Sequence, residues 1–211
     1  MNVKQKSPRR PSMATEPELH AWADLSHLER VENARVEKET VTLDGITAFM
    51  ECVMDHAVFQ GDGRTVLFAD VVFDGCDLSN LNLDEAVFRR CEFKNCRMLG
   101  TSFIRAVFQD ITMTGCVCDY ANFSGSKWRL LSWQNCRFRE ASLNMCEVAG
   151  PVIAGCDFQS AEIAGTKLAG WDLSDSFIGS LAVRAEDLKG VTVNRDQAAA
   201  LAGLFGIHVK D

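Results

Sequence analysis

The sequence lacks a long apolar segment. None of its stretches approaches the ~20 consecutive apolar residues that cross a bilayer. Residues 1–17 carry four basic side chains, but no apolar segment follows them, so neither a secretory nor a twin-arginine leader is predicted. We therefore expect a protein without a membrane partner.

The sequence also lacks recognisable catalytic motifs. Its four histidines, His20, His27, His56 and His208, are far apart, and no G-x-S-x-G, phosphate-binding loop or H-E-x-x-H pattern occurs. We therefore predict a protein that is not an enzyme and that has no catalytic residue, cofactor site or metal site.

An excess of basic charge is missing as well. The chain has 22 basic and 29 acidic residues, a net charge of −7, and residues 1–40 contain seven of each, so the deficit lies wholly in residues 41–211. An acidic surface repels phosphate groups and attracts basic surfaces. Direct nucleic-acid binding is therefore not expected, whereas a protein partner with a basic surface is.

A strict period of five residues is what the sequence does contain. From Phe68 to Leu173 an apolar residue, here called an anchor, occupies every fifth position without insertion, and phenylalanine supplies nine of these 22 anchors. Neither an α-helix, with a period of about 3.6, nor a flat strand, with a period of about 2, fits this pattern. The chain must therefore wind as a coil of short sides that each bury one anchor.

Each five-residue unit has the same internal pattern. A small residue is common two positions before the anchor, the residue between them is mostly polar, and glycine recurs two positions after the anchor. The in, out, in order is that of a short extended segment, and the residues after it turn the chain. Stacked coils would pair edge to edge at about 4.8 Å, so the predicted fold class is all-β.

The nine cysteines follow the same period. Seven lie two residues before an anchor, Cys118 is itself an anchor, and Cys52 is in phase within an earlier unit. Free cysteine behaves as a small apolar residue in such a position, so we interpret these residues as core rather than as disulfides or metal ligands. Unpaired thiols in this number indicate a reducing, cytoplasmic location.

Segments of a different character flank the repeat. Thr15 with Glu18, and Ser26 with Glu29, resemble helix capping boxes, so one or two short helices are expected there to cover the open end of the first coil. The expected divisions are a disordered basic tail at 1–14, an N-terminal cap region at 15–46, the repeat at 47–193 and a C-terminal helix with a cap or dimerisation role at 194–211.

One break interrupts the phase of the repeat. Phe59 and Phe68 are nine residues apart rather than ten, and the Asp-Gly and Gly-Asp pairs between them are typical of turns. We expect a corner that dips outward here. Alternatively, Asp62 and Arg64 of this loop touch a partner.

The C-terminal segment predicts a helix. Asn194 and Gln197 form a capping pair, the alanines after them are strong helix formers, and Gly206 is a fitting stop. Residues 207–209 then predict a short strand.

Several units resemble the A(D/N)LxG consensus of the pentapeptide-repeat proteins. They include 121–125 (Ala-Asn-Phe-Ser-Gly), 76–80 (Cys-Asp-Leu-Ser-Asn) and 171–175 (Trp-Asp-Leu-Ser-Asp). The resemblance implies a right-handed quadrilateral parallel β-helix, a solenoid in which four five-residue units make each coil.

The ending at 188–209 is similar to that of the Qnr and MfpA group of this family, and 96–103 resembles a segment of MfpA. In that group the C-terminal helix forms a dimer interface. The rod-shaped dimer mimics duplex DNA, binds DNA gyrase or topoisomerase IV and protects it from quinolones. The resemblance thus implies a homodimer with these interface residues: Leu201, Leu204, Phe205 and Ile207.

Two features depart from that group. The main run has no insertion for the protruding loops of Qnr proteins, which makes the chain more similar to MfpA. No predicted face is uniformly acidic, and one carries several basic residues, although a DNA mimic should present rows of carboxylates. The alternative function is therefore a structural scaffold or interaction module with a different partner. The candidate partner-contact surface comprises Asp62, Arg64, Asp77, Asp84 and Glu85.

Overall fold

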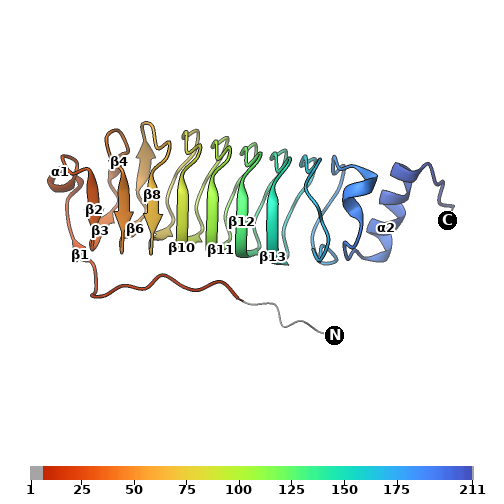
Figure 1. Cartoon of the computed structure of the whole chain (residues 1–211), viewed down its shortest axis with the longest axis horizontal. Helices are drawn as coiled ribbons and strands as arrows, with labels where there is room; N and C mark the ends of the chain where they lie inside the picture. Colours follow the sequence, from red (N-terminus) through yellow and green to blue (C-terminus); the bar gives the residue numbers. More distant parts are fainter. Residues whose placement is uncertain (1–6, 211) are drawn as a thin grey trace.

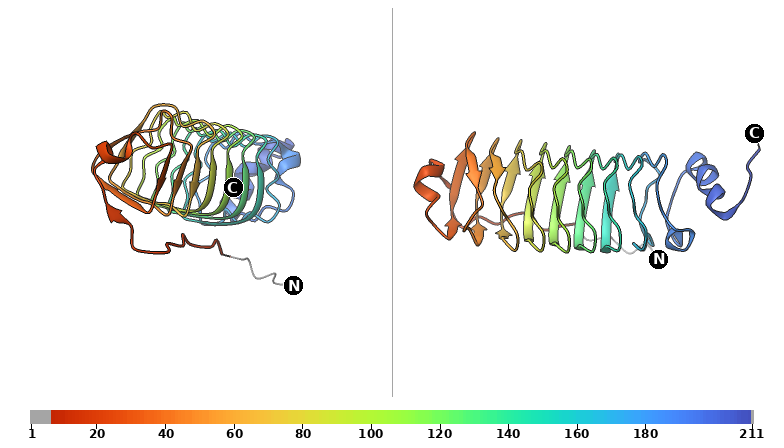
Figure 2. Two further views of the ribbon diagram at one scale, coloured as in Figure 1. Left: turned by 60° about the vertical axis from the view of Figure 1, so that its left-hand side comes forward. Right: turned by 90° about the horizontal axis from the view of Figure 1, so that it is seen from above.

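The protein is a rod of stacked coils. Its structure, a computed structural model, describes residues 7–210. Helix α1 (Trp22–Leu25) lies at one end of the rod and helix α2 (Arg195–Ala202) at the other (Figure 1). The two further views in Figure 2 show the coils following one another along a single axis, as the five-residue period predicts.

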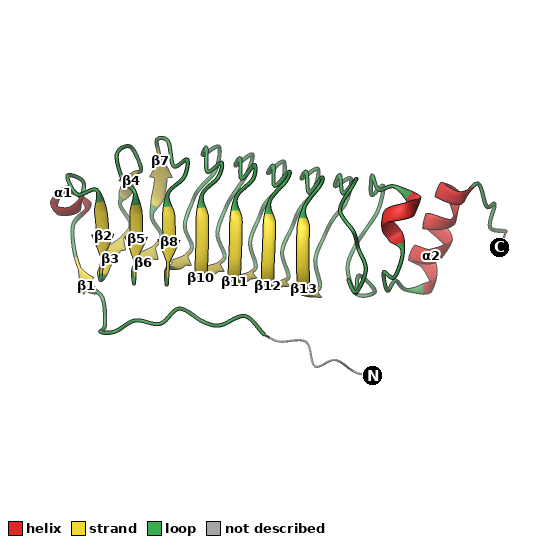
Figure 3. Cartoon of the chain, in the orientation of Figure 1, coloured by secondary structure: helices red, strands yellow, loops and turns green. Residues whose placement is uncertain are grey.

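Parallel strands occupy the sides of the coils up to residue 154 (Figure 3). The main sheet has the order β1-β3-β6-β9-β10-β11-β12-β13. A second row of paired strands, β2-β5-β8, joins this sheet at β10, and β4 pairs separately with β7. The strands are β1 (Glu18–Leu19), β2 (Arg30–Glu32), β3 (Ala34–Glu37), β4 (Thr40–Thr42), β5 (Ala48–Met50), β6 (Val53–Asp55), β7 (Val58–Gln60), β8 (Leu67–Ala69), β9 (Val72–Asp74), β10 (Val87–Lys94), β11 (Val107–Thr114), β12 (Lys127–Gln134) and β13 (Glu147–Ala154).

The register of the strands gives each central coil 20 residues. Phe88 pairs with Phe108, and Phe93 pairs with Met113. The two remaining sides of the coil are joined by single bridges with the same spacing, such as Asp77 to Arg97 and Asn82 to Ser102. A coil of 20 residues holds four five-residue units, so the prediction of a four-sided parallel β-solenoid is confirmed.

The anchors form the core of the rod. All 22 point inward, and only Val148 and Ile153 are partly rather than fully buried. Phenylalanine rings of successive coils stack, with centroids 4.9 Å apart for Phe68 and Phe88. Burial of each such ring contributes about 1.5–3 kcal/mol, so the ladder is the main source of stability.

The nine cysteines are free and buried, as expected of core residues. Seven of their thiols bond to main-chain carbonyls of the coil before; the Cys91 Sγ, for example, donates to the Phe68 carbonyl at 3.4 Å. The small side chain therefore fits the crowded interior, and the weak S–H donor has a partner.

The corners require left-handed backbone. The residue two positions after the anchor has a positive φ, for example 58° at Asn80 and 65° at Gly100. A Cβ at Gly100 would lie 2.9 Å from Oδ1 of Asn80 in the preceding coil. Glycine recurs at this position because it tolerates the conformation and leaves room for the neighbouring side chain.

The solenoid begins earlier than the sequence suggested. Residues 30–46 were expected to belong to a cap region, but β2 pairs with β5, β3 with β6 and β4 with β7, so they form the first coil. Its anchors are also spaced by five and buried, but the run is short and was missed. These anchors are Val31, Val36 and Val41.

The N-terminal region contains one short helix, and it is capped differently from the prediction. Helix α1 has four residues, its N-cap is Ala21, and Ser26 is its C-cap, so neither predicted capping box starts a helix. Trp22 is 7% exposed and stacks on Phe49 with centroids 6.2 Å apart. The expected covering of the first coil is therefore made by α1, which buries both Trp22 and Leu25.

The phase slip at Gln60–Thr65 is a corner with one residue fewer. Val58 pairs with Asp77, a separation of 19, whereas Asp62 pairs with Asn82, a separation of 20. Gly63 takes the place of an anchor, and the Leu43 and Leu83 side chains lie 2.6 Å from where its Cβ would be. Two leucines from adjacent coils thus fill the space of the missing side chain.

The N-terminal segment does not behave as the expected solvated tail. Residues 7–15 run along the outside of the rod back toward α1 (Figure 1), and several of them bond to it. The basic residues Lys4 and Lys6 lie outside the described residues. Arg9 bonds to Asp110, which is 101 positions away in the sequence, so local composition does not reveal this contact.

The C-terminal end is closed by helix α2. Asn194 and Gln197 form the predicted capping box, and the Gln197 Nε2 also donates to the carbonyls of Leu173 at 2.9 Å and Ser176 at 2.6 Å. The 3-10 helices η1 (Ala185–Leu188) and η2 (Gly203–Phe205) precede and follow it, and Gly206 ends η2 with a φ of 70°. The strand predicted at 207–209 does not form.

Candidate functional site

The described part of the chain, 7–210, exposes side chains along the sides of the rod and at its two ends. Within it, no three histidine, cysteine or acidic side chains are grouped so that they could hold a metal ion. No helix in this range has the length and apolarity to cross a membrane. The places to look for function are therefore the outward side chains and the two ends.

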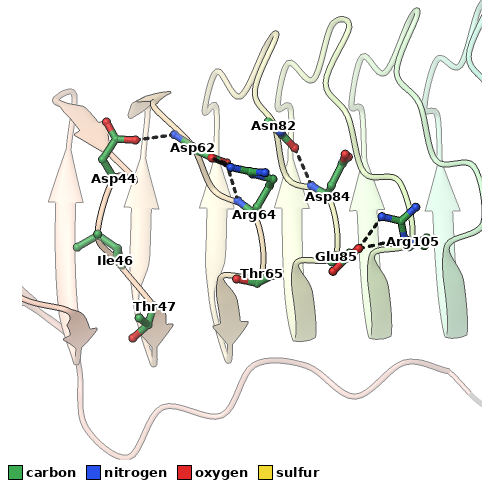
Figure 4. A pocket seen from close by; sticks show the side chains of 11 residues that line it. Asp44, Ile46, Thr47, Asp62, Arg64, Thr65, Asn82, Asp84, Glu85 and Arg105 are labelled. Carbon is green, nitrogen blue, oxygen red and sulfur yellow. Dashed lines mark hydrogen bonds and ion pairs between the residues drawn. The ribbon is translucent and has the colours of Figure 1, made fainter.

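Four of the five residues predicted to contact a partner lie together. Asp62, Arg64, Asp84 and Glu85 line one shallow depression near the N-terminal end of the rod (Figure 4). Asp77 does not join them. It lies one side earlier on its coil, where its carboxylate is 3.8 Å from the Arg97 guanidinium.

The corners that follow β4 and β7 are stacked on one another and form the first part of this depression. Asp44 follows β4, and its Oδ1 accepts a hydrogen bond of 2.8 Å from the backbone N–H of Asp62, which follows β7. Arg64 folds back so that its Nη2 is 2.6 Å from Oδ2 of Asp62. The short corner at Gln60–Asp62 thus holds an acidic and a basic side chain side by side.

The next two coils complete the depression. Oδ1 of Asp84 accepts hydrogen bonds from the Ser102 hydroxyl and, at 3.0 Å, from the backbone N–H of Ile104. Oε1 of Glu85 accepts from the Arg105 Nη2 at 2.6 Å. The carboxylates are therefore tied to neighbouring coils, which fixes their positions.

The depression is acidic on balance. Asp44, Asp62, Asp84 and Glu85 supply four negative charges, and Arg64 and Arg105 supply two positive ones. The hydrogen bonds from Arg64, first from its side chain and then from its backbone, lower the pKa of Asp62, and the hydrogen bond to Glu85 raises the pKa of Arg105. Both pairs are solvated, so they contribute little stability and remain available to a basic partner.

Two charged members of this depression were missed in the sequence. Asp44 stands before Gly45 in the same Asp-Gly turn chemistry as Asp62, which was a usable signal. Arg105 gave no such signal, because only the 20-residue register brings it beside Glu85.

Elsewhere on the rod, acidic side chains are paired with arginines. Asp70 bonds to Arg90 one coil later, and Asp119 is 2.7 Å from Arg137. These pairs join residues 18 or 20 positions apart, which is the spacing of adjacent coils. They neutralise carboxylates that would otherwise form rows along a face.

The C-terminal end carries a cluster of exposed apolar side chains. Leu204, Phe205 and Ile207, all predicted interface residues, are 45%, 58% and 57% exposed, and Val209 is 59% exposed beside them in sequence. Leu201 is half-buried and packs against the core. The structure thus separates the predicted set into three surface residues and one that supports them.

Comparison with known proteins identifies the central coils. Residues 66–136 match the family model described as a pentapeptide repeat region. The same 20-residue register continues beyond the match, since β12 pairs with β13 through residue 154. No curated protein sequence matches the chain.

Solved structures with the same fold include resistance proteins. A trypsin-treated variant of QnrB1, described as a plasmid-mediated fluoroquinolone resistance protein, aligns with a TM-score of 0.51 and 19% identity over 86% of this chain and 100% of its own. HetL, a pentapeptide repeat protein involved in heterocyst differentiation regulation in the cyanobacterium Nostoc, aligns with a TM-score of 0.48 and 12% identity over 85% of this chain and 90% of its own. The QnrB1 likeness establishes the pentapeptide-repeat fold.

Proposed function

We propose that the chain is a non-enzymatic, homodimeric DNA mimic. It binds DNA gyrase or topoisomerase IV and modulates or protects that enzyme, as in resistance to fluoroquinolones or related topoisomerase poisons. The observation that carries this proposal is the C-terminal end. There Gln197 seals the last coil while Leu204, Phe205 and Ile207 remain exposed.

An exposed apolar cluster at the end of a rod favours association with a second copy. Contact through this cluster would remove three large apolar side chains from water in each chain. Two rods joined end to end would form one long particle with an acidic depression near each distal tip. This shape fits an elongated, DNA-like ligand.

Charge and likeness support the choice of partner. The chain has a net charge of −7, and the depression lined by Asp62, Asp84 and Glu85 is acidic on balance. Such a surface is attracted to the basic groove that holds DNA in a topoisomerase. The similar fold of QnrB1, a fluoroquinolone resistance protein, makes this class of enzyme the first partner to examine.

A supercoiling assay with DNA gyrase and ciprofloxacin tests the proposal. We expect the purified protein to inhibit supercoiling at high concentration and to restore it in the presence of the drug. Replacing Asp84→Lys and Glu85→Lys should lower potency by about tenfold or more, because like charges then face the groove. Glu140→Lys on another side of the rod is the matched control and should act as wild type.

The alternative is an interaction module with a different partner. The pairing of carboxylates with arginines of adjacent coils favours it, because a DNA mimic needs unpaired negative charge. If the protein neither inhibits gyrase or topoisomerase IV nor protects them, the topoisomerase proposal is wrong. The oligomeric state, measured separately, would still test the C-terminal interface.

A further inference from the structure

The N-terminal segment lies along the outside of the rod, through contacts that local sequence does not explain. Five residues from Arg9 to Thr15 contact successive coils in descending order. Their partners are Asp110, Glu92, Asp70, Glu51 and Asn33, which lie along or beside one corner of the solenoid. We call the four acidic members, Glu51, Asp70, Glu92 and Asp110, the acidic groove.

Asp110 is the deepest point of this groove. Its side chain is completely buried, and the hydrogen bonds it accepts come from Arg9, through the backbone N–H at 3.1 Å, Nε at 3.1 Å and Nη2 at 2.8 Å. Burial acts to raise the pKa of Asp110, but these hydrogen bonds outweigh it and lower the pKa below its ordinary value. A buried carboxylate whose donors all come from one arginine is a specific arginine site.

The groove also recognises the main chain of its occupant. The backbone N–H groups of Arg9, Ser12 and Ala14 donate to Asp110, Asp70 and Glu51 at 3.1, 2.9 and 2.6 Å. Asp70 is held in place by Arg90, which bonds to it from the next coil. Main-chain recognition does not depend on the occupant's side chains, so the groove can accept other extended peptides.

The spacing of the groove fits an extended chain. From Asp110 to Asp70 is two coils, or about 10 Å at about 4.8 Å per coil. From Arg9 to Ser12 is three residues, or about 10 Å of extended chain. The stacking distance of the coils and the rise of an extended peptide therefore match over this length.

Prolines prepare the segment for this conformation. Pro8 and Pro11 flank the two arginines. Proline fixes φ near the extended region and disfavours helix in the residue before it. The segment thus loses little entropy when it binds, and its positive charge complements the groove.

Three of the five acidic side chains at left-handed corners of the described chain lie in this one column, the other two being Glu85 and Glu140. Glu51, Asp70 and Asp110 occupy the left-handed corner position, with φ of 53°, 57° and 58°. Other corners of the rod often use glycine there, as at Gly100 and Gly125. Acidic side chains are not needed to turn the chain, so the solenoid itself does not account for them.

We propose that the acidic groove is a docking site for an extended, arginine-bearing peptide segment of a partner protein. Residues 9–14 occupy it in cis and act as a built-in competitor, and the partner segment binds by displacing them. The groove follows a different corner of the rod from the depression at Asp62 and Asp84. The inference therefore holds whether or not the partner of that depression is a topoisomerase.

Competition by the tethered segment determines the experiment. A tethered segment reaches an effective concentration on the order of millimolar, which masks the groove from a free peptide. Weakening the segment within the full-length chain should unmask it. Arg9→Ala does so without changing the rod, because Arg9 contributes its side chain only to Asp110.

The test is a titration with a fluorescent peptide of residues 7–15. We expect this peptide to bind the full-length Arg9→Ala protein at least about tenfold more tightly than the wild type. Adding Asp110→Ala to that variant should remove the gain. A peptide with alanine in place of its first arginine should bind about tenfold more weakly.

Controls separate a lost site from a lost fold. Glu140→Gln, at a corner on another side of the rod, should leave peptide binding unchanged. Circular dichroism and Asp70→Asn provide a second test if Asp110→Ala unfolds. Equal peptide affinity for wild type and Arg9→Ala, or binding that ignores both Asp110→Ala and Asp70→Asn, would overturn the proposal.

Discussion

The two ends of the rod are closed by different chemistry. At the N-terminal end the indole ring of Trp22 covers the core, and the exposed leucines nearby, Leu19 and Leu28, are isolated in sequence. At the C-terminal end Gln197 closes the last coil through hydrogen bonds, and a cluster of apolar side chains follows it. The C-terminal end therefore combines a seal with a group of exposed apolar side chains, which the N-terminal end does not.

The largest effect is expected from removing the N-terminal cover. Trp22→Ala should lower the free energy of unfolding by about 3–5 kcal/mol, because a buried indole leaves a cavity over Phe49. Urea unfolding measures the loss, and thiol labelling at Cys52 reports whether the first coils open. Leu19→Ala is the control, since its exposed side chain should change stability by no more than about 0.5 kcal/mol. Equal effects of the two variants would show that Trp22 does not cover the core.

The second test concerns the interface at the other end. Phe205→Asp should raise the dissociation constant of the predicted dimer by about 100-fold, because a carboxylate would be buried without a partner. Light scattering should then show monomers of unchanged thermal stability. Met145→Asp, at an exposed apolar residue away from this end, should remain dimeric. A dimer that persists in the Phe205→Asp variant would contradict the proposal that the C-terminal segment forms the interface.

A third change separates sealing from association. Gln197→Ala should cost about 1–3 kcal/mol, because the buried carbonyls of Leu173 and Ser176 lose their donor. We expect Cys156, near this end, to become reactive before Cys52. Gln159→Ala, at an exposed glutamine, is the matched control for stability. If Cys52 reacts first, the hydrogen bonds of Gln197 are not what keeps the C-terminal end closed.

The smallest expected effect is a pH dependence of the buried thiols. Burial raises the pKa of Cys91 to about 12 and that of Cys52 to about 11, from an ordinary value of 9.0. Unfolded thiols lose protons first as pH rises, so stability should be constant below pH 9.0 and fall above it. We expect a loss on the order of 1 kcal/mol per thiol from about pH 8 to about pH 10.

Urea unfolding across this pH range measures the slope. Cys91→Ala and Cys52→Ala should each make the decrease of the free energy of unfolding with pH shallower. Cys91→Ala should have the same effect in a protein that also carries Trp22→Ala, whose N-terminal end is open. A stability that rises with pH would contradict the burial of these thiols.

The interior was predictable because burial repeats every five residues. Phe68, Phe88 and Phe108 lie one coil apart, and each needs only its own unit to point inward. The first coil was missed although Val31, Val36 and Val41 obey the same spacing, because three anchors are too few to stand out. The short corner was noticed in sequence, but that Gly63 replaces an anchor between Leu43 and Leu83 was visible only in the structure.

The candidate sites were predictable only in part. Asp62, Arg64, Asp84 and Glu85 come together because the register places their corners one above another. Asp77 carries similar chemistry but lies on another side of the coil. The acidic groove gave no sequence signal, since Arg9 and Asp110 are 101 residues apart.

By itself the sequence determined the solenoid, its buried thiols and its C-terminal helix. Each of these follows from local patterns, because a five-residue period and a capping box act over a few neighbouring residues. Only the tertiary structure decided which outward side chains meet. The 20-residue coil sets which corners stack, and the extended N-terminal segment crosses several coils to reach Asp110. Contacts between coils depend on that register, which no single unit contains.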